Sequence, residues 1–152
     1  MSKYGSPKAA REAAAEAQGF LASVEIVAGN ETFEVPQRGL LDDDQAERLA
    51  ELELETETWD REDDVTLSTG SVVRGALKRP YRKNGKLIKP AYPVRVAIAL
   101  WGEEKYARYK AAGGRSADVT AALALMDQRV QEREQDDSKS VGRDSSSEAV
   151  SD

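Results

Sequence analysis

Apolar and polar residues alternate over positions 24–36, and this alternation predicts the clearest β-structure of the chain. It is interrupted by Gly29 and Asn30, a pair that favours a two-residue hairpin loop. With that loop, Ile26 lies opposite Phe33, and the apolar side chains of both strands share one face. Because an isolated hairpin is unstable, we expect this face to cover part of a core.

The next amphipathic pattern predicts a helix that begins at Asp43 or Asp44 and ends near Trp59. Leu49 and Leu52 then fall on one side of the helix together with Trp59. Aspartate is a favoured helix-capping residue, and acidic side chains at a helix N-terminus complement the helix dipole. The acidic residues of this segment are therefore expected on the solvent side of the helix.

Two further helices are predicted in the C-terminal half. The first covers 94–110, with Pro93 in its first turn and Gly102 as a potential kink. The second covers 117–130 and is capped by Ser116. The positions expected on their buried stripes are Val94, Ala97, Ile98, Trp101, Tyr106, Tyr109, Val119, Leu123, Met126 and Val130.

The remaining segments lack a clear period. Residues 1–22 read as a flexible or partly helical N-terminal arm, and 132–152 as a disordered polar C-terminal tail. A short strand is predicted at 72–73, and 80–93 reads as an extended basic loop around an Asn-Gly turn. We therefore expect an α+β, mainly helical fold: one domain over 23–131, with an N-terminal β-hairpin followed by three or so amphipathic helices.

The amino-acid composition excludes most kinds of catalytic site. The chain of 152 residues has no Cys and no His, which excludes thiolate nucleophiles, Ser-His triads and the usual zinc sites. We expect no enzymatic activity, no cofactor and no metal. No run approaches the ~18 consecutive apolar residues of a membrane helix, so we expect a soluble protein that stays in the cell that makes it.

Charge is strongly separated along the chain although the net charge is only −6. Residues 40–64 contain twelve acidic side chains and two basic ones, whereas residues 74–115 contain twelve basic and two acidic ones. Basic residues interleaved with aromatic ones can hold single-stranded nucleic acid. The acidic pI near 4.9 argues against that use and favours neutralisation of the acidic segment, within the fold or across a subunit contact.

Two small clusters have alternative interpretations. Asp42, Asp43 and Asp44 could bind a divalent cation, but the spacing and glycine of an EF-hand loop are missing and a helix cap is favoured. Arg115 and Ser116 could hold an anion at a helix N-terminus, but an ordinary helix cap at Ser116 is the favoured interpretation.

Three stretches resemble the tail assembly chaperones of siphoviruses that infect actinobacteria, such as mycobacteriophages. FEVPQRGLLDDDQAERLAEL at 33–52 resembles the short strand, Leu-Leu-Asp-Asp pair and helix of that family. PYRKNGKLIKPAYPVRVAIALWGEEKYARYKAAGGRSADV at 80–119 resembles its central basic loop and helix, and is the most specific of the three. The polar end around 137–140 resembles its C-terminus. Together they cover about two thirds of the chain.

The resemblance implies a non-enzymatic protein made in the cytoplasm of an infected bacterium and absent from the mature virion. Such chaperones bind the tape measure protein and help recruit major tail tube subunits during tail morphogenesis. The family also makes a longer product by programmed frameshift, and this chain would be the short, unshifted form. Self-association and association with the longer form are further expected partnerships.

The predicted contact residues come from the basic loop and the two helical stripes. Tyr106, Tyr109 and Met126 are expected to offer adaptable contacts to a helical partner. For the tryptophan and tyrosine residues the core is the favoured interpretation, and exposed binding anchors are the alternative. The full predicted set is Tyr81, Arg82, Lys83, Trp101, Tyr106, Tyr109 and Met126. The alternative functions are a nucleic-acid-associated protein that uses 74–115, and a structural head–tail component of the virion.

Overall fold

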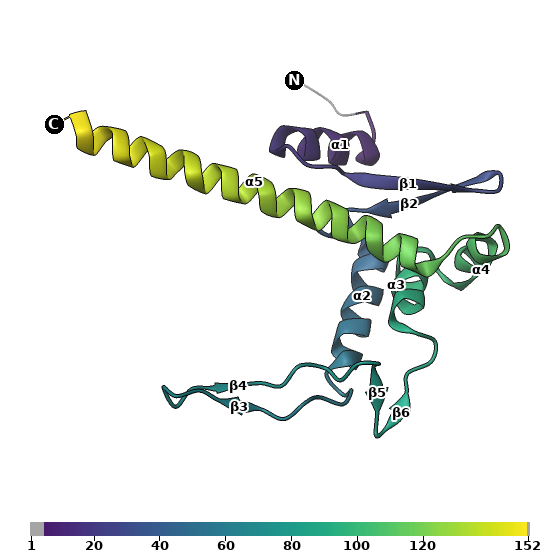
Figure 1. Ribbon diagram of the computed structural model, residues 1–152. Helices are drawn as coiled ribbons and strands as arrows, with labels where there is room; N and C mark the ends of the chain where they lie inside the picture. Colours follow the sequence, from purple (N-terminus) through teal and green to yellow (C-terminus); the bar gives the residue numbers. More distant parts are fainter. Residues whose placement is uncertain (1–4, 152) are drawn as a thin grey trace. The chain divides into compact units, whose positions relative to one another are not determined.

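The computed structural model describes the backbone of residues 5–151 and the side chains of residues 5–136. The chain divides into two compact units. Unit 1 comprises Met1–Leu41 and Ala112–Asp152, and unit 2 comprises Asp42–Ala111. Helices predominate over short antiparallel strand pairs, which confirms the α+β, mainly helical fold class (Figure 1). The single domain predicted over 23–131 stays a prediction.

Unit 1 contains the hairpin that the alternating pattern predicts. β1 (Ser23–Ala28) and β2 (Glu31–Pro36) pair antiparallel, with Ile26 opposite Phe33 as expected. The side chains of Phe33 and Val35 are fully buried. The predicted loop, register and buried face of this hairpin are therefore confirmed.

The N-terminal helix α1 (Pro7–Gln18) is capped by the hydroxyl of Ser6 and lies next to the hairpin. The ammonium of Lys8 lies 3.9 Å from a carboxylate oxygen of Glu25 and 4.0 Å from one of Glu34. The register places these two glutamates directly opposite each other. Lys8 thus offsets a like-charge pair, although all three side chains are exposed enough for the gain to be small.

The C-terminal helix α5 (Ser116–Ser151) begins at the predicted position and contacts β2. Val119, Leu123 and Met126 are buried along one side, as the stripe predicts. The helix continues past residue 131 without a break. The predicted disorder of 132–152 stays a prediction, since the side chains of 137–152 lie outside the described residues.

Unit 2 begins with α2 (Asp43–Thr56), whose N-terminus is closed by a capping box. The Asp42 carboxylate accepts from the Gln45 backbone N–H at 2.7 Å, and the Gln45 amide oxygen accepts from the Asp42 backbone N–H at 3.0 Å. The helix ends before Trp59, which is nevertheless buried with 3% of its surface exposed. The buried residues of α2 itself are Leu49 and Leu52.

The single helix predicted over 94–110 is two helices in the structure. α3 (Tyr92–Trp101) ends at Gly102, and α4 (Glu103–Ala111) follows. Gly102 has φ +83°, a left-handed conformation that a right-handed helix cannot contain. The glycine therefore breaks the helix rather than kinking it. The buried residues of α3 are Val96, Ala97, Ala99 and Leu100, so its stripe is rotated relative to the prediction.

Short strand pairs complete unit 2. β3 (Val65–Thr66) pairs with β4 (Val72–Val73), the strand that the sequence predicts. β5 (Arg82–Lys83) pairs with β6 (Lys86–Leu87). The two residues between β5 and β6, Asn and Gly, both have positive φ, which confirms the predicted turn within the basic loop.

Candidate functional site

A two-stranded arm extends from the end of α2 (Figure 1). Backbone hydrogen bonds join its two strands along their length. At the base, the Lys78 N–H donates to the Asp60 carbonyl at 3.0 Å, and near the tip, the Leu67 N–H donates to the Ser71 carbonyl at 2.8 Å. It comprises residues 60–78 and contains β3 and β4. We call it the β3–β4 arm.

The base of the β3–β4 arm is closely packed around Gly75. The Gly75 N–H donates to the Asp64 carboxylate at 2.9 Å, and its carbonyl accepts from the Arg61 guanidinium at 3.0 Å. A Cβ at this position would overlap the carbonyl oxygen of Glu62. The two chains can therefore approach each other here only because residue 75 has no side chain.

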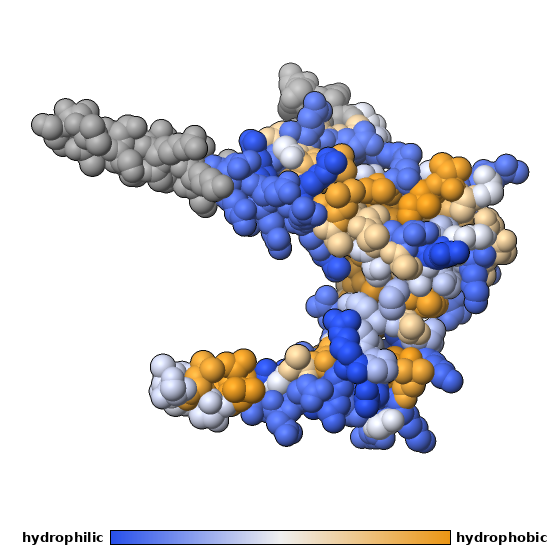
Figure 2. All heavy atoms as spheres, in the orientation of Figure 1, coloured by the Kyte–Doolittle hydropathy of each residue, from blue (hydrophilic) through white to orange (hydrophobic). Residues whose placement is uncertain are grey.

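The far part of the β3–β4 arm exposes apolar side chains on both of its faces. Val65 lies opposite Val73, and Val72 lies opposite Thr66 on the other face. Residues 65–73 contain no charged side chain in a chain that is 33% charged. Figure 2 shows the apolar patch at the end of the arm. The exposed fractions are 56% for Val65, 46% for Leu67, 64% for Val72 and 48% for Val73.

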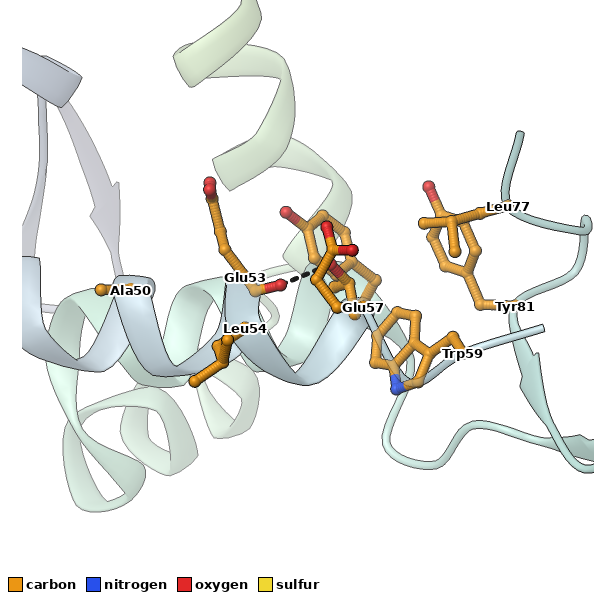
Figure 3. A pocket seen from close by; sticks show the side chains of 9 residues that line it. Ala50, Glu53, Leu54, Glu57, Trp59, Leu77 and Tyr81 are labelled. Carbon is orange, nitrogen blue, oxygen red and sulfur yellow. Dashed lines mark hydrogen bonds between the residues drawn. The ribbon is translucent and has the colours of Figure 1, made fainter. Parts of the chain in front are cut away.

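A groove of about 480 Å³ lies in unit 2 where α2 ends (Figure 3). Trp59 lies between the end of α2 and the segment that carries Leu77 and Tyr81. Glu53 in the last turn of α2 and Glu57, the residue after the helix, also line the groove, and their carboxylates give it a partly acidic margin. The lining residues are Ala50, Glu53, Leu54, Thr56, Glu57, Trp59, Leu77, Tyr81 and Tyr92.

Three aromatic rings form one wall of this groove. The ring centroid of Trp59 lies 5.4 Å from that of Tyr81 and 6.2 Å from that of Tyr92, and the two tyrosines are 5.7 Å apart. These tilted and edge-to-face arrangements are favourable for aromatic packing. The Arg79 guanidinium lies 4.7 Å from the Tyr81 centroid, so this ring already accepts a cation on its face.

The basic segment neutralises part of the acidic segment within unit 2. Arg95 donates to both carboxylate oxygens of Glu55, at 2.9 and 3.0 Å. Arg74 donates to Glu57 at 2.8 Å, and this hydrogen bond and charge hold the pKa of Glu57 below its ordinary value. Neutralisation within the fold, one of the two expected arrangements, is therefore present at these pairs.

Asp60 holds the β5–β6 turn through its carboxylate. Its two oxygens accept the backbone N–H groups of Asn84 and Gly85, each at 2.9 Å. These hydrogen bonds, that of Gly85 first, lower the pKa of Asp60 below its ordinary value. The basic loop is thus attached to the end of α2 by an acidic residue.

The predicted contact residues of the basic loop lie at or near the groove. Tyr81 is half-buried in its aromatic wall. Arg82 donates to the carbonyls of Pro80 and Arg79, each at 3.1 Å, and so stabilises the loop itself. Lys83 is exposed at the end of β5. Their assignment to partner binding stays a prediction.

The other predicted contact residues are placed differently. Tyr109 and Met126 are buried, with 0% and 1% of their surfaces exposed, so neither side chain is available to a partner. Both positions lie on the stripes that the sequence predicts to be buried, so the structure agrees with that expectation and not with their use as exposed contacts. Trp101 and Tyr106 are half-buried, with ring centroids 4.9 Å and 6.3 Å from that of Tyr109.

The sequence prediction missed two parts of this surface. The predicted contact set did not include Leu54, Leu77 or Tyr92, which line the groove. It also missed the arm, although apolar residues on both sides of the polar, glycine-containing stretch 68–71 are a local hairpin signal. Strands of two residues are too short for that signal to stand out.

The acidic run 42–44 is a helix start in the structure, as favoured from the sequence, with Asp42 in the capping box. In the described part of the chain, no group of three or more acidic side chains has the arrangement of a metal site. No helix among the described residues is both long enough and apolar enough to cross a membrane.

Comparisons of this chain with protein-family models, curated proteins and solved structures found no match. The interpretation of the surface therefore depends on its residues and geometry.

Proposed function

We propose that this protein is a phage tail assembly chaperone that binds the tape measure protein, keeps it soluble, and assists recruitment of tail tube subunits without catalysis. The observation that carries the proposal is the β3–β4 arm, which exposes apolar side chains on both faces. The resemblance of residues 33–52 and 80–119 to that family is the reason for proposing a tail assembly chaperone and the tape measure protein as its partner.

The arm supports protein binding for a physical reason. A two-stranded ribbon is marginally stable alone, and contiguous exposed apolar side chains on an open strand pair are typical of interaction sites. A partner that covers Val65, Val72 and Val73 would remove this surface from water. The same contacts would cover apolar segments of a long helical protein and so limit its aggregation.

Protein binding is also favoured over nucleic-acid binding by the basic side chains. Arg74 and Arg95 pair with glutamates of the same unit, and Arg82 donates to backbone carbonyls. Phosphate contacts would have to compete with these interactions. Binding of the full chain to single-stranded DNA, with the steep salt dependence of phosphate contacts, would support the alternative instead.

Co-expression with the tape measure protein tests the proposal. We expect the wild-type chain to increase the soluble fraction of the tape measure protein several-fold. The double variant Val65→Ser/Val73→Ser should lose most of this effect, because it removes the larger apolar face of the arm. Val27→Ser is the matched control, since Val27 is 71% exposed on β1 in unit 1.

No increase in solubility with the wild-type chain would contradict the proposal. An equal loss for the arm variant and for Val27→Ser would contradict the role of the arm. Mass spectrometry of purified particles provides a second test, because a stoichiometric amount of this chain in virions would favour the structural head–tail alternative.

A further inference from the structure

We propose that the outer face of α2, continuous with the groove at its end, is a docking site for an amphipathic helix whose apolar stripe is flanked by Lys and Arg. This inference rests on the proposed function and specifies the chemistry of the partner segment. The surface is defined by the exposed apolar line of α2, its flanking glutamates and the groove. We call it the α2 docking face.

The apolar line of the α2 docking face consists of Ala46, Ala50 and Leu54. Their spacing of four residues places them on one side of the helix, opposite Leu49 and Leu52, which are buried. All three are exposed, and Leu54 has 73% of its surface exposed. Ala50 and Leu54 also line the groove, so the line leads directly to its aromatic wall.

Small residues in this line allow close approach of another helix. Ala46 and Ala50 present only methyl groups, so a partner helix can pack near the α2 backbone there. The larger Leu54 and the groove beyond it would then receive a bulky apolar side chain of the partner. This is the helix-in-groove mode of recognition, in which a few anchor residues at helical spacing supply most of the affinity.

Acidic side chains flank the apolar line on both sides. Glu47 and Glu51 fall on one flank of α2 and Glu53 on the other, as their positions in the helical repeat require. None of these three forms an ion pair with any residue that the structure describes, whereas Glu55 and Glu57 do. The docking face therefore carries free negative charge beside its apolar line.

Charge complementarity then selects the partner. A helix with Lys or Arg beside its apolar stripe would pair with both acidic flanks, whereas a helix with acidic flanks would be repelled. The groove also suits the apolar stem of a basic side chain, because the aromatic wall already holds the Arg79 guanidinium against Tyr81. We assign the docking face to a basic amphipathic helix on these grounds.

Two designed peptides of about 18 residues, five helical turns, serve as the probe. Both have the same leucine stripe; one has lysine at every flanking position and the other has glutamate. Binding to the full chain is measured by fluorescence anisotropy of the labelled peptides. We expect the lysine peptide to bind and the glutamate peptide to bind at least about tenfold more weakly.

The decisive variant is Glu47→Gln/Glu51→Gln/Glu53→Gln. It should weaken binding of the lysine peptide about tenfold, as expected for three exposed charge pairs. The control Glu104→Gln/Glu132→Gln/Glu134→Gln removes the same charge from exposed positions elsewhere and should leave binding nearly unchanged. Leu54→Ser should weaken binding as well, with Val27→Ser as its control.

Equal binding of the two peptides, or equal effects of the two triple variants, would overturn the inference. Co-expression separates this failure from failure of the proposed function. If the α2 triple variant keeps the tape measure protein as soluble as the wild-type chain does, the chaperone proposal stands and the docking face is wrong. If the peptides behave as expected but the wild-type chain does not solubilise the tape measure protein, the docking face stands and its assigned partner is wrong.

Discussion

Asp60 links three parts of unit 2 through its own atoms. Its backbone N–H donates to the Arg82 carbonyl at 2.7 Å, and its carbonyl accepts from Lys78 at the base of the arm. Its carboxylate accepts from Asn84 and Gly85 in the β5–β6 turn. Asp60, just beyond the end of α2, therefore holds both the β3–β4 arm and the basic loop.

The charge of Asp60 predicts a pH dependence of this attachment. Because the pKa is lowered in the folded protein, the carboxylate stabilises the fold fully above its ordinary pKa of 3.8. This contribution is lost as the pH falls through the lower folded pKa. We expect the Asn84 and Gly85 amide resonances to shift together in that range in an NMR titration. Asp60→Asn should remove the transition.

The control for this titration is Asp63→Asn, which changes an exposed carboxylate of the arm. It should leave the transition of the two turn amides in place. A transition of these amides at or above pH 3.8, or one that persists in Asp60→Asn, would show that another group holds the turn.

The β3–β4 arm is the element on which the proposed function most depends, and its geometry can be changed without changing its apolar side chains. Gly75→Ala places a methyl group against the Glu62 carbonyl and should force the two chains apart at the base. We expect a loss of stability of about 1–3 kcal/mol, the usual cost of overpacking. Urea unfolding and NMR contacts between Val65 and Val73 provide the measurements.

Ser71→Ala is the matched control, because it adds no bulk at an exposed position near the end of the same arm. Gly75→Ala should also reduce solubilisation of the tape measure protein, although every exposed valine is retained. If the cross-strand contacts and the stability remain unchanged in Gly75→Ala, close packing at the base does not determine how the two strands of the arm are paired.

The elements that the sequence predicts well are those whose signals are local. The β1–β2 hairpin follows from a period of two and the Gly29–Asn30 loop, and both signals specify the same register. The start of α2 follows from its acidic cap and the spacing of Leu49 and Leu52. In each case neighbouring residues alone determine the outcome.

The elements that the sequence predicts poorly depend on tertiary context. The pattern around Gly102 continues a helical stripe, so the sequence does not distinguish a kink from the observed break between α3 and α4. Tyr109 and Met126 lie on stripes that the sequence predicts to be buried, but only the fold shows that their burial is complete. The groove brings Leu54, Leu77 and Tyr92 together from three segments, and no local period encodes that meeting.

Across the whole molecule, charge separation along the sequence has two consequences in space. Arg74 and Arg95 neutralise two of the glutamates at the end of α2. The glutamates further along its outer face have no such partner among the described residues. The basic segment therefore completes the fold of unit 2, while surplus negative charge stays on the α2 docking face. The net charge of −6 conceals both effects.

The division into two units predicts how the molecule responds to loss of core packing. Leu100 is buried in unit 2 and Leu123 in unit 1, each with 2% of its surface exposed. Replacement of either by Ala should cost about 2–5 kcal/mol of local stability. In hydrogen exchange, Leu100→Ala should speed exchange in α2 and α3, and Leu123→Ala should speed exchange in β1, β2 and the start of α5.

Each variant serves as the control for the other, because the lost volume is the same and only the unit differs. Faster exchange confined to the substituted unit would mean that the two units unfold separately. The α2 docking face and the β3–β4 arm, both in unit 2, would then keep their geometry when unit 1 opens. Equal acceleration of all these amides by both variants would instead show one cooperative structure and contradict the prediction.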